Sequence, residues 1–107
     1  MLSKRDAQCK FKARIFNALS DTVRLEIVEF LRGGEKCVCE IVPHVGLIQP
    51  MVSRHLRILK DCGLVKDRKE GNKRLYSITE PGIFNMIDAA TADLIDSLFK
   101  RIMAQVA

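Results

Sequence analysis

Hydrophobic positions recur at a helical spacing over most of the chain. Apolar residues three or four positions apart lie on one face of a helix, so this spacing indicates amphipathic helices. The pattern predicts four helices before residue 62 and one long helix after residue 80. Their apolar positions are, in order, Phe11, Ile15, Phe16, Ala18 and Leu19; Val23, Leu25, Ile27, Val28, Phe30 and Leu31; Val38, Ile41, Val42 and Val45; Met51, Val52, Leu56, Ile58 and Leu59; and Ile83, Ile87, Ala90, Leu94, Leu98 and Ile102.

Glycines and prolines divide these helices. Gly33-Gly34 ends the second helix, and a short third helix is expected from about Cys37 to His44, with a turn at Gly46. The fourth helix is expected over Gln49–Lys60, because Pro50 suits a first helical turn and Gly63 suits a helix end.

A basic hairpin follows the fourth helix. Two short extended runs, Val65–Lys69 and Lys73–Ile78, are joined by Glu70-Gly71-Asn72, and Gly-Asn is a turn signal. The last helix is expected over residues 81–104. The predicted fold is mainly α with a β-hairpin, a single winged helix-turn-helix domain over residues 1–107.

The positive charge is concentrated. The net charge is +5; residues 49–76 hold eight Lys or Arg against three acids, and residues 1–19 hold five against one, so residues 1–10 are expected to form a basic arm. A basic helix beside a basic hairpin predicts double-stranded DNA as the partner, since such a helix fits the major groove. The residues expected to contact DNA are Gln49, Met51, Ser53, Arg54 and Arg57 on the helix, and Arg68, Lys69, Lys73 and Arg74 at the hairpin.

Four cysteines (Cys9, Cys37, Cys39 and Cys62) are the other notable chemistry. No leading apolar segment follows Met1, so a cytoplasmic protein with reduced thiols and no membrane association is expected. Thiolates at Cys37 and Cys39 would be good ligands for soft ions. Residues two apart on an ideal helix point in nearly opposite directions. Both sulfurs can therefore hold one ion only if the helix start is irregular or unwinds on binding.

Three segments carry a resemblance to a known family. Ala18–Leu25, Val52–Leu56 and Gly63-Leu64-Val65, in this order and spacing, resemble the arsenic-repressor (ArsR/SmtB) family of winged-helix metal sensors. The resemblance implies a homodimer joined by the first and last helices, which releases a palindromic operator when an inducer binds. It also implies that Gln49, Ser53, Arg54 and His55 lie on the DNA-facing helix. His55 is expected to support DNA contact or packing. Ile48 replaces the family's usual capping Ser.

The segment Glu35–Ile41 resembles the third-helix site of the family's arsenic, antimony, cadmium and lead sensors. The arsenic version often has a further Cys where this chain has Val42. The resemblance makes Cys9, from the partner subunit, a candidate third ligand. Three sulfurs favour As(III) or Sb(III) over Cd or Pb. The family's other site, on the last helix, is not expected because that helix has no histidine.

The expected function is a repressor released by such an inducer at Cys37 and Cys39, with no obligatory cofactor. The alternative is the same repressor acting as a thiol–disulfide redox switch without metal. An enzyme is not expected, since no catalytic Ser/His/Asp set, phosphate loop or carboxylate pair is present. A protein-interaction module built on the last helix is a further class, which loss of DNA binding in a reduced, metal-free sample would favour.

Overall fold

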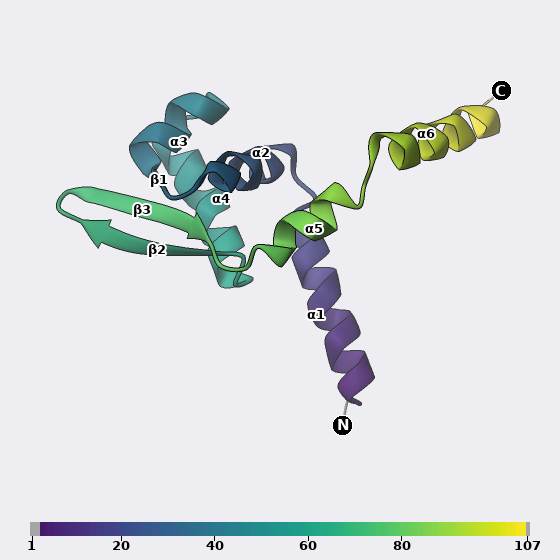
Figure 1. The fold of residues 1–107 in the computed structure, drawn as a ribbon, viewed down its shortest axis with the longest axis horizontal. Helices are drawn as coiled ribbons and strands as arrows, with labels where there is room; N and C mark the ends of the chain where they lie inside the picture. The colour runs from purple at the N-terminus through teal and green to yellow at the C-terminus, as the bar shows by residue number, and fades with distance from the viewer. Residues whose placement is uncertain (1–2, 107) are drawn as a thin grey trace.

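The computed structural model describes residues 3–106 and is mainly helical, with one small sheet (Figure 1). The sheet lies to one side of the helices and its hairpin projects from the body. The elements are α1 (Lys4–Ala18), α2 (Thr22–Phe30), the 3-10 turn η1 (Leu31–Gly33), β1 (Lys36–Cys37), α3 (Val38–Val45), α4 (Gln49–Asp61), β2 (Val65–Glu70), β3 (Lys73–Ile78), α5 (Gly82–Asp88) and α6 (Ala92–Val106).

The core is formed where α2, α3 and α4 pack against the base of the sheet. The apolar side chains that the periodicity marked on these helices are buried or partly buried, except Leu25 and Met51, which are exposed. Fully burying an aliphatic side chain contributes about 1.5–3 kcal/mol. The core therefore fixes α4 relative to the sheet. Its largest fully buried side chains are Ile27, Val28, Ile41, Val52, Leu56 and Leu59.

The sheet has three antiparallel strands in the order β1-β3-β2. The two predicted hairpin strands are confirmed, and Gly71 between them adopts the positive φ that their tight turn requires. Strand β1 was not predicted, because a strand of two residues is too short to show an alternating pattern. It pairs Lys36 with Tyr76 and Cys37 with Leu75. Cys37 is therefore part of the same sheet as the hairpin.

The first helix begins earlier than the apolar pattern indicated. The side chain of Ser3 accepts a hydrogen bond of 3.1 Å from the Asp6 backbone N–H. A serine in this position caps a helix, so the helix starts at Lys4. Residues 4–10 therefore belong to α1 and do not form a separate arm, and Met1 and Leu2 lie outside the described residues. The basic side chains of this segment are carried on a helix.

The expected single helix over residues 81–104 is wrong, because the chain breaks into α5 and α6 at Ala89–Thr91. The Thr91 hydroxyl accepts a hydrogen bond of 3.2 Å from the Leu94 N–H. Such a bond caps and starts a new helix. At the end of α5, Arg32 holds Asp88 through two hydrogen bonds of 2.8 and 3.0 Å, and its guanidinium lies over Phe84. The periodicity continues through the break and so does not reveal it.

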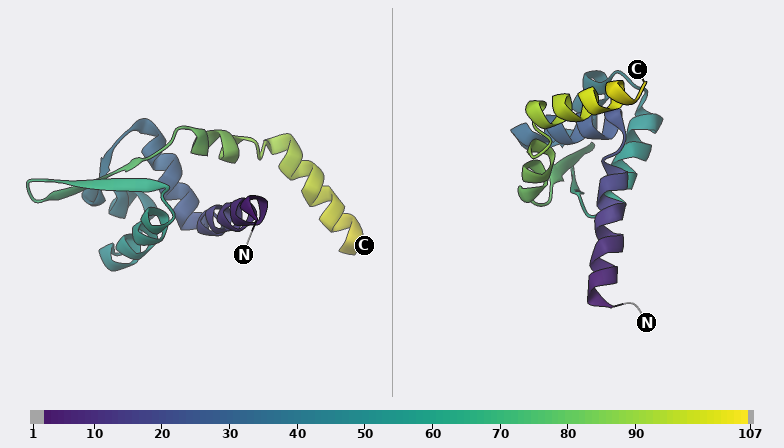
Figure 2. Two further views of the ribbon diagram at one scale, coloured as in Figure 1. Left: turned by 90° about the horizontal axis from the view of Figure 1, so that it is seen from below. Right: turned by 90° about the vertical axis from the view of Figure 1, so that its right-hand side faces the viewer.

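Helices α1 and α6 leave the body in different directions (Figure 2). The radius of gyration is 16.4 Å. A compact chain of this length would have a radius of roughly 13 Å. No residue of α6 is buried. Five large apolar side chains on the two helices are each at least 46% exposed: Phe11, Phe16, Leu94, Leu98 and Phe99. In the single chain these apolar faces are uncovered.

Over residues 3–106, none of the helices is both long and apolar enough to cross a bilayer.

Candidate nucleic-acid interface and thiol site

Helices α3 and α4 form the helix-turn-helix. Gly46 ends α3 in the left-handed conformation, at φ 72°, and its N–H bonds the Val42 carbonyl at 3.0 Å. Glycine adopts this helix-ending conformation without steric cost. Three residues later α4 begins, with one face buried in the core. The opposite face is exposed and carries the predicted contact residues Gln49, Met51, Ser53, Arg54 and Arg57. These side chains are therefore free to meet a DNA groove.

The N-terminus of α4 lacks the side-chain cap that a Ser would supply. Ile48 is the N-cap residue and makes no side-chain hydrogen bond. Pro50 has no N–H to satisfy. Met51 and Val52 both donate to the Ile48 carbonyl, at 3.1 Å and 3.2 Å. The proline and the bonds to the Ile48 carbonyl thus replace part of what a capping side chain would supply.

His55 lies on α4 but faces α2. Its Nδ1 is 3.2 Å from a guanidinium nitrogen of Arg24 and 4.0 Å from an Asp21 carboxylate oxygen. Arg24 also donates to the Ala18 carbonyl at 2.6 Å. The pKa of Asp21 lies below its usual value, chiefly because its carboxylate accepts the Arg24 backbone N–H at the start of α2. This network holds α4 against the junction of α1 and α2 through Nδ1 of His55, and no hydrogen bond within residues 3–106 engages its Nε2.

The basic residues of the wing (β2, β3 and their turn) differ in their partners. Arg68 pairs with Glu35 at 2.7 Å and with Glu70 at 3.0 Å. The hydrogen bonds from Arg68 draw the pKa of Glu35 below its usual value. By contrast, no ion pair within residues 3–106 involves Lys69 or Lys73. The two lysines are available for phosphates, whereas Arg68 ties β2 to the segment before Cys37.

Asp67 joins the wing to α4. Its side chain is 9% exposed and pairs with Lys60 at 2.9 Å and Arg74 at 2.6 Å. The hydrogen bond from Lys60 and then that from Arg74 lower the pKa of Asp67. Arg74, predicted to contact DNA, is thus already paired.

Cys37 and Cys39 lie together at the start of α3, where the structure joins them as a disulfide. Cys37 is the N-cap residue and is extended, at φ −71° and ψ 148°, so the helix start is irregular as the two-sulfur site requires. The Cys37 sulfur accepts a hydrogen bond from Cys39 N–H at 3.0 Å, and Cys37 N–H donates to Glu40 at 3.0 Å. Cys37 is buried and Cys39 is exposed.

A groove of about 540 Å³ connects the cysteine pair to residues predicted to contact DNA. It lies between α3, the first turns of α4 and the wing. The cysteine pair and the predicted DNA-contact residues therefore line the same groove. The groove is lined by Cys37, Val38, Cys39, Val42, Gln49, Ser53, Asn72, Lys73, Arg74 and Tyr76.

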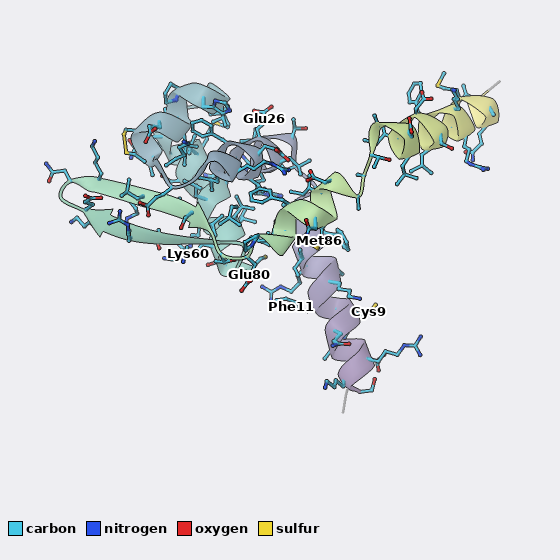
Figure 3. The ribbon with its side chains drawn as sticks, in the orientation of Figure 1. Cys9, Phe11, Glu26, Lys60, Glu80 and Met86 are labelled. Carbon is cyan, nitrogen blue, oxygen red and sulfur yellow. A yellow bond between two sulfur atoms is a disulfide. The ribbon has the colours of Figure 1, made fainter. Side chains whose placement is uncertain are left out.

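Cys9 does not join this pair within one chain. It lies on α1, on the other side of the molecule from the disulfide (Figure 3). In the described part of the chain, no three His, Cys, Asp or Glu residues come together as metal ligands. Once reduced to thiolates, the two adjacent cysteines would suit a thiophilic ion. Cys62, at the end of α4, lies 3.9 Å from the Arg14 carbonyl of α1.

Sequence reasoning did not find the residues that hold the interface in place, namely Arg24, Glu35 and Asp67. Each has a charged side chain of a kind that is common on protein surfaces. Their roles depend on partners distant in the sequence, so no local pattern marks them.

An exposed basic helix after a tight turn, beside a basic hairpin, defines a winged helix-turn-helix DNA-binding protein. Residues 21–67 match the bacterial regulatory protein family named arsR. An arsenical resistance operon repressor of Staphylococcus xylosus is 44% identical over 64 residues, which are 60% of this chain and 62% of that protein. The chain thus spans less than two thirds of that relative.

Two solved structures are similar over nearly the whole chain. The crystal structure of Rv0081 from Mycobacterium tuberculosis has a TM-score of 0.76 at 32% identity, covering 89% of this chain and 96% of that one. The solution structure of the homodimeric winged helix-turn-helix DNA-binding domain Mb0332 from Mycobacterium bovis has a TM-score of 0.79 at 28% identity, covering 92% and 91%. The chain belongs to the ArsR family of transcriptional regulators, which are DNA-binding proteins and not enzymes.

Proposed function

We propose that this protein is a cytoplasmic, homodimeric repressor that releases its operator when As(III) or Sb(III) binds Cys37 and Cys39. The observation that carries the proposal is the shared groove, which Cys37 and Cys39 line together with Gln49, Ser53 and Lys73. An event at the sulfurs therefore takes place beside the residues expected to read bases and hold phosphates.

The ligand class follows from the chemistry of the pair. Thiolates bind soft ions in preference to hard ones. The N-terminus of α3 favours negative charge on the Cys37 sulfur. Cys9 of the partner subunit is the proposed third ligand. A site of three sulfurs suits As(III) or Sb(III) better than it suits cadmium, for which a four-sulfur site is expected. The similarity to an arsenical resistance operon repressor is consistent with a thiophilic inducer.

Release follows from where Cys37 lies. Its backbone belongs both to the sheet of the wing and to the start of α3. Drawing the two sulfurs around an ion changes the geometry of the α3 start, and α3 packs against α4. The wing and the reading helix then no longer fit one DNA site together.

The dimer is proposed to form through α1 and α6. Their exposed apolar faces are the support, since a monomer rarely leaves so large an apolar surface uncovered. The homodimeric state of the similar domain from Mycobacterium bovis is consistent with this arrangement.

The test is to replace the thiols singly. Cys37→Ser and Cys39→Ser should each bind the operator like the wild type but no longer release it on adding As(III), because a hydroxyl is close in size to a thiol but a poor ligand for a soft ion. Cys62→Ser is the matched control and should respond normally, and Cys9→Ser should weaken the response. If both Cys37→Ser and Cys39→Ser respond to As(III) like the wild type, the proposal is wrong.

A second candidate function, a thiol–disulfide switch, is favoured by the disulfide between Cys37 and Cys39. In this case mild oxidation alone releases the operator, and a dithiol restores binding. A wild-type protein that ignores As(III) but responds reversibly to oxidant would select this function. A protein that keeps the operator when fully oxidised would exclude it.

A further inference from the structure

The two sulfurs of the Cys37–Cys39 disulfide are not equivalent. Cys37 is only 4% exposed, whereas Cys39 is an exposed residue on the first turn of α3. An attacking thiolate must approach a sulfur from outside the protein. Access therefore favours attack on Cys39.

The other sulfur is the better leaving group. Cys37 Sγ accepts the Cys39 backbone N–H at 3.0 Å and caps the eight-residue helix α3. A thiolate at this position gains from the hydrogen bond and from the partial positive charge at the helix N-terminus. Breaking the disulfide so that the electron pair stays on Cys37 is therefore the favoured direction.

The groove beside the disulfide fits a particular class of thiol. Its volume of about 540 Å³ lies in the range of small-molecule sites. Its walls combine apolar Val38 and Val42 with polar Asn72 and cationic Lys73. Arg74 is paired with Asp67, but no ion pair within residues 3–106 engages Lys73. A small thiol that carries carboxylates matches this lining, because Lys73 can bind a carboxylate while the thiolate reaches Cys39.

We propose that Cys39 is a site of thiol–disulfide exchange with a small anionic thiol. The sulfur of the incoming thiolate forms a bond with Cys39 Sγ, the Cys37–Cys39 bond breaks, and the electron pair leaves on Cys37 as a thiolate. The product is a mixed disulfide at Cys39, and no other oxidant or reductant is needed. This inference rests on the redox form of the proposed function.

The adduct has a direct consequence for DNA binding. It lies in the groove between Gln49, Ser53 and Lys73 and brings carboxylates to the place where a phosphate would be held. Like charges repel, and the added volume separates the reading helix from the wing. The mixed disulfide is therefore a DNA-releasing state.

The first experiment measures the exchange rate. The disulfide form of a Cys9→Ser, Cys62→Ser protein is mixed with glutathione, as an anionic thiol, or with neutral 2-mercaptoethanol, and rates are compared per thiolate. Lys73→Ala should slow the glutathione reaction about 3–10-fold at low salt and leave the 2-mercaptoethanol reaction unchanged, as expected for electrostatic attraction. Lys66→Ala, an exposed lysine of β2 outside the groove, is the matched control. Equal effects of Lys73→Ala on both thiols would overturn the proposal.

The second experiment identifies the attacked sulfur. The reaction is quenched with acid, free thiols are alkylated, and the peptide from Cys37 to Arg54 is sequenced by mass spectrometry. Glutathione should be on Cys39 and the alkyl group on Cys37. Glutathione on Cys37, or a protein whose cysteine pair cannot be oxidised to the disulfide, would overturn the proposal. An As(III) titration of the reduced protein tests the metalloid function separately, so the two failures are distinguishable.

Discussion

Replacing Asp67 with Asn tests how the wing is held against the reading helix. The substitution keeps the size of the side chain but removes the charge that pairs with Lys60 on α4 and Arg74 on β3. Exposed ion pairs contribute about 0.2–1 kcal/mol each. Lys60 and Arg74 are half-exposed, but the Asp67 side chain is only 9% exposed, so the upper end of that range applies. The expected loss is about 1–2 kcal/mol of unfolding free energy.

The loss should depend on pH in a defined direction. The pKa of Asp67 in the folded protein is lower than its ordinary value of 3.8, because Lys60 and Arg74 stabilise the carboxylate. A lowered carboxyl pKa contributes stability that is fully present above the unfolded-state pKa and is lost as the pH falls through the folded-state pKa. The wild type and Asp67→Asn should therefore differ fully near pH 7 and converge as the pH falls through the lowered pKa of Asp67.

Denaturant unfolding at a fixed protein concentration, repeated across this pH range, provides the measurement. Thermal unfolding near neutral pH should show a decrease of about 5–10 °C in Tm. Asp61→Asn is the control, since Asp61 is exposed and forms no ion pair among residues 3–106. A variant as stable as the wild type at pH 7 would refute the reasoning, and so would a deficit that persists at low pH.

Three further predictions concern DNA binding and assembly. Arg54→Ala should weaken operator binding by about 1–3 kcal/mol, and a titration with random DNA should show a smaller loss; equal losses would mean that Arg54 only contacts phosphate. Lys73→Ala should weaken binding to every DNA alike and reduce the slope of log K against log salt by about one, which a salt titration measures. Leu94→Arg should yield monomers with weak operator binding, checked by analytical ultracentrifugation; a wild type already monomeric at micromolar concentration would contradict this prediction.

The sequence was most informative where the periodicity was long and the turns were marked. Helix α4 and the hairpin were predicted nearly to the residue, because Val52, Leu56 and Leu59 show a helical spacing and Gly63 and Gly71 mark the turns. The condition for a two-sulfur site, an irregular start of the third helix, was also derived from spacing alone, and it is met.

The remaining features depend on contacts that no local pattern records. The strand Lys36–Cys37 forms only because β3 is there to pair with it. The break before α6 depends on one Thr91 hydrogen bond within a continuous apolar stripe. Arg74 and Arg68 look like free DNA-binding residues in the sequence, but tertiary folding supplies each with a carboxylate.

The ion pair between Arg32 and Asp88 has a geometric consequence for DNA recognition. Asp88 is the last residue of α5, so Arg32 fixes the point from which α6 departs. Helix α6 has 15 residues. At the usual helical rise it is about 22 Å long, so a tilt of about 10° at its base moves its far end by about 4 Å. That displacement is close to the rise of about 3.4 Å per base pair. In the proposed dimer joined by α6, a change at the Arg32–Asp88 pair would therefore shift the distance between the two reading helices by about one base pair, while every predicted base-reading side chain stays the same.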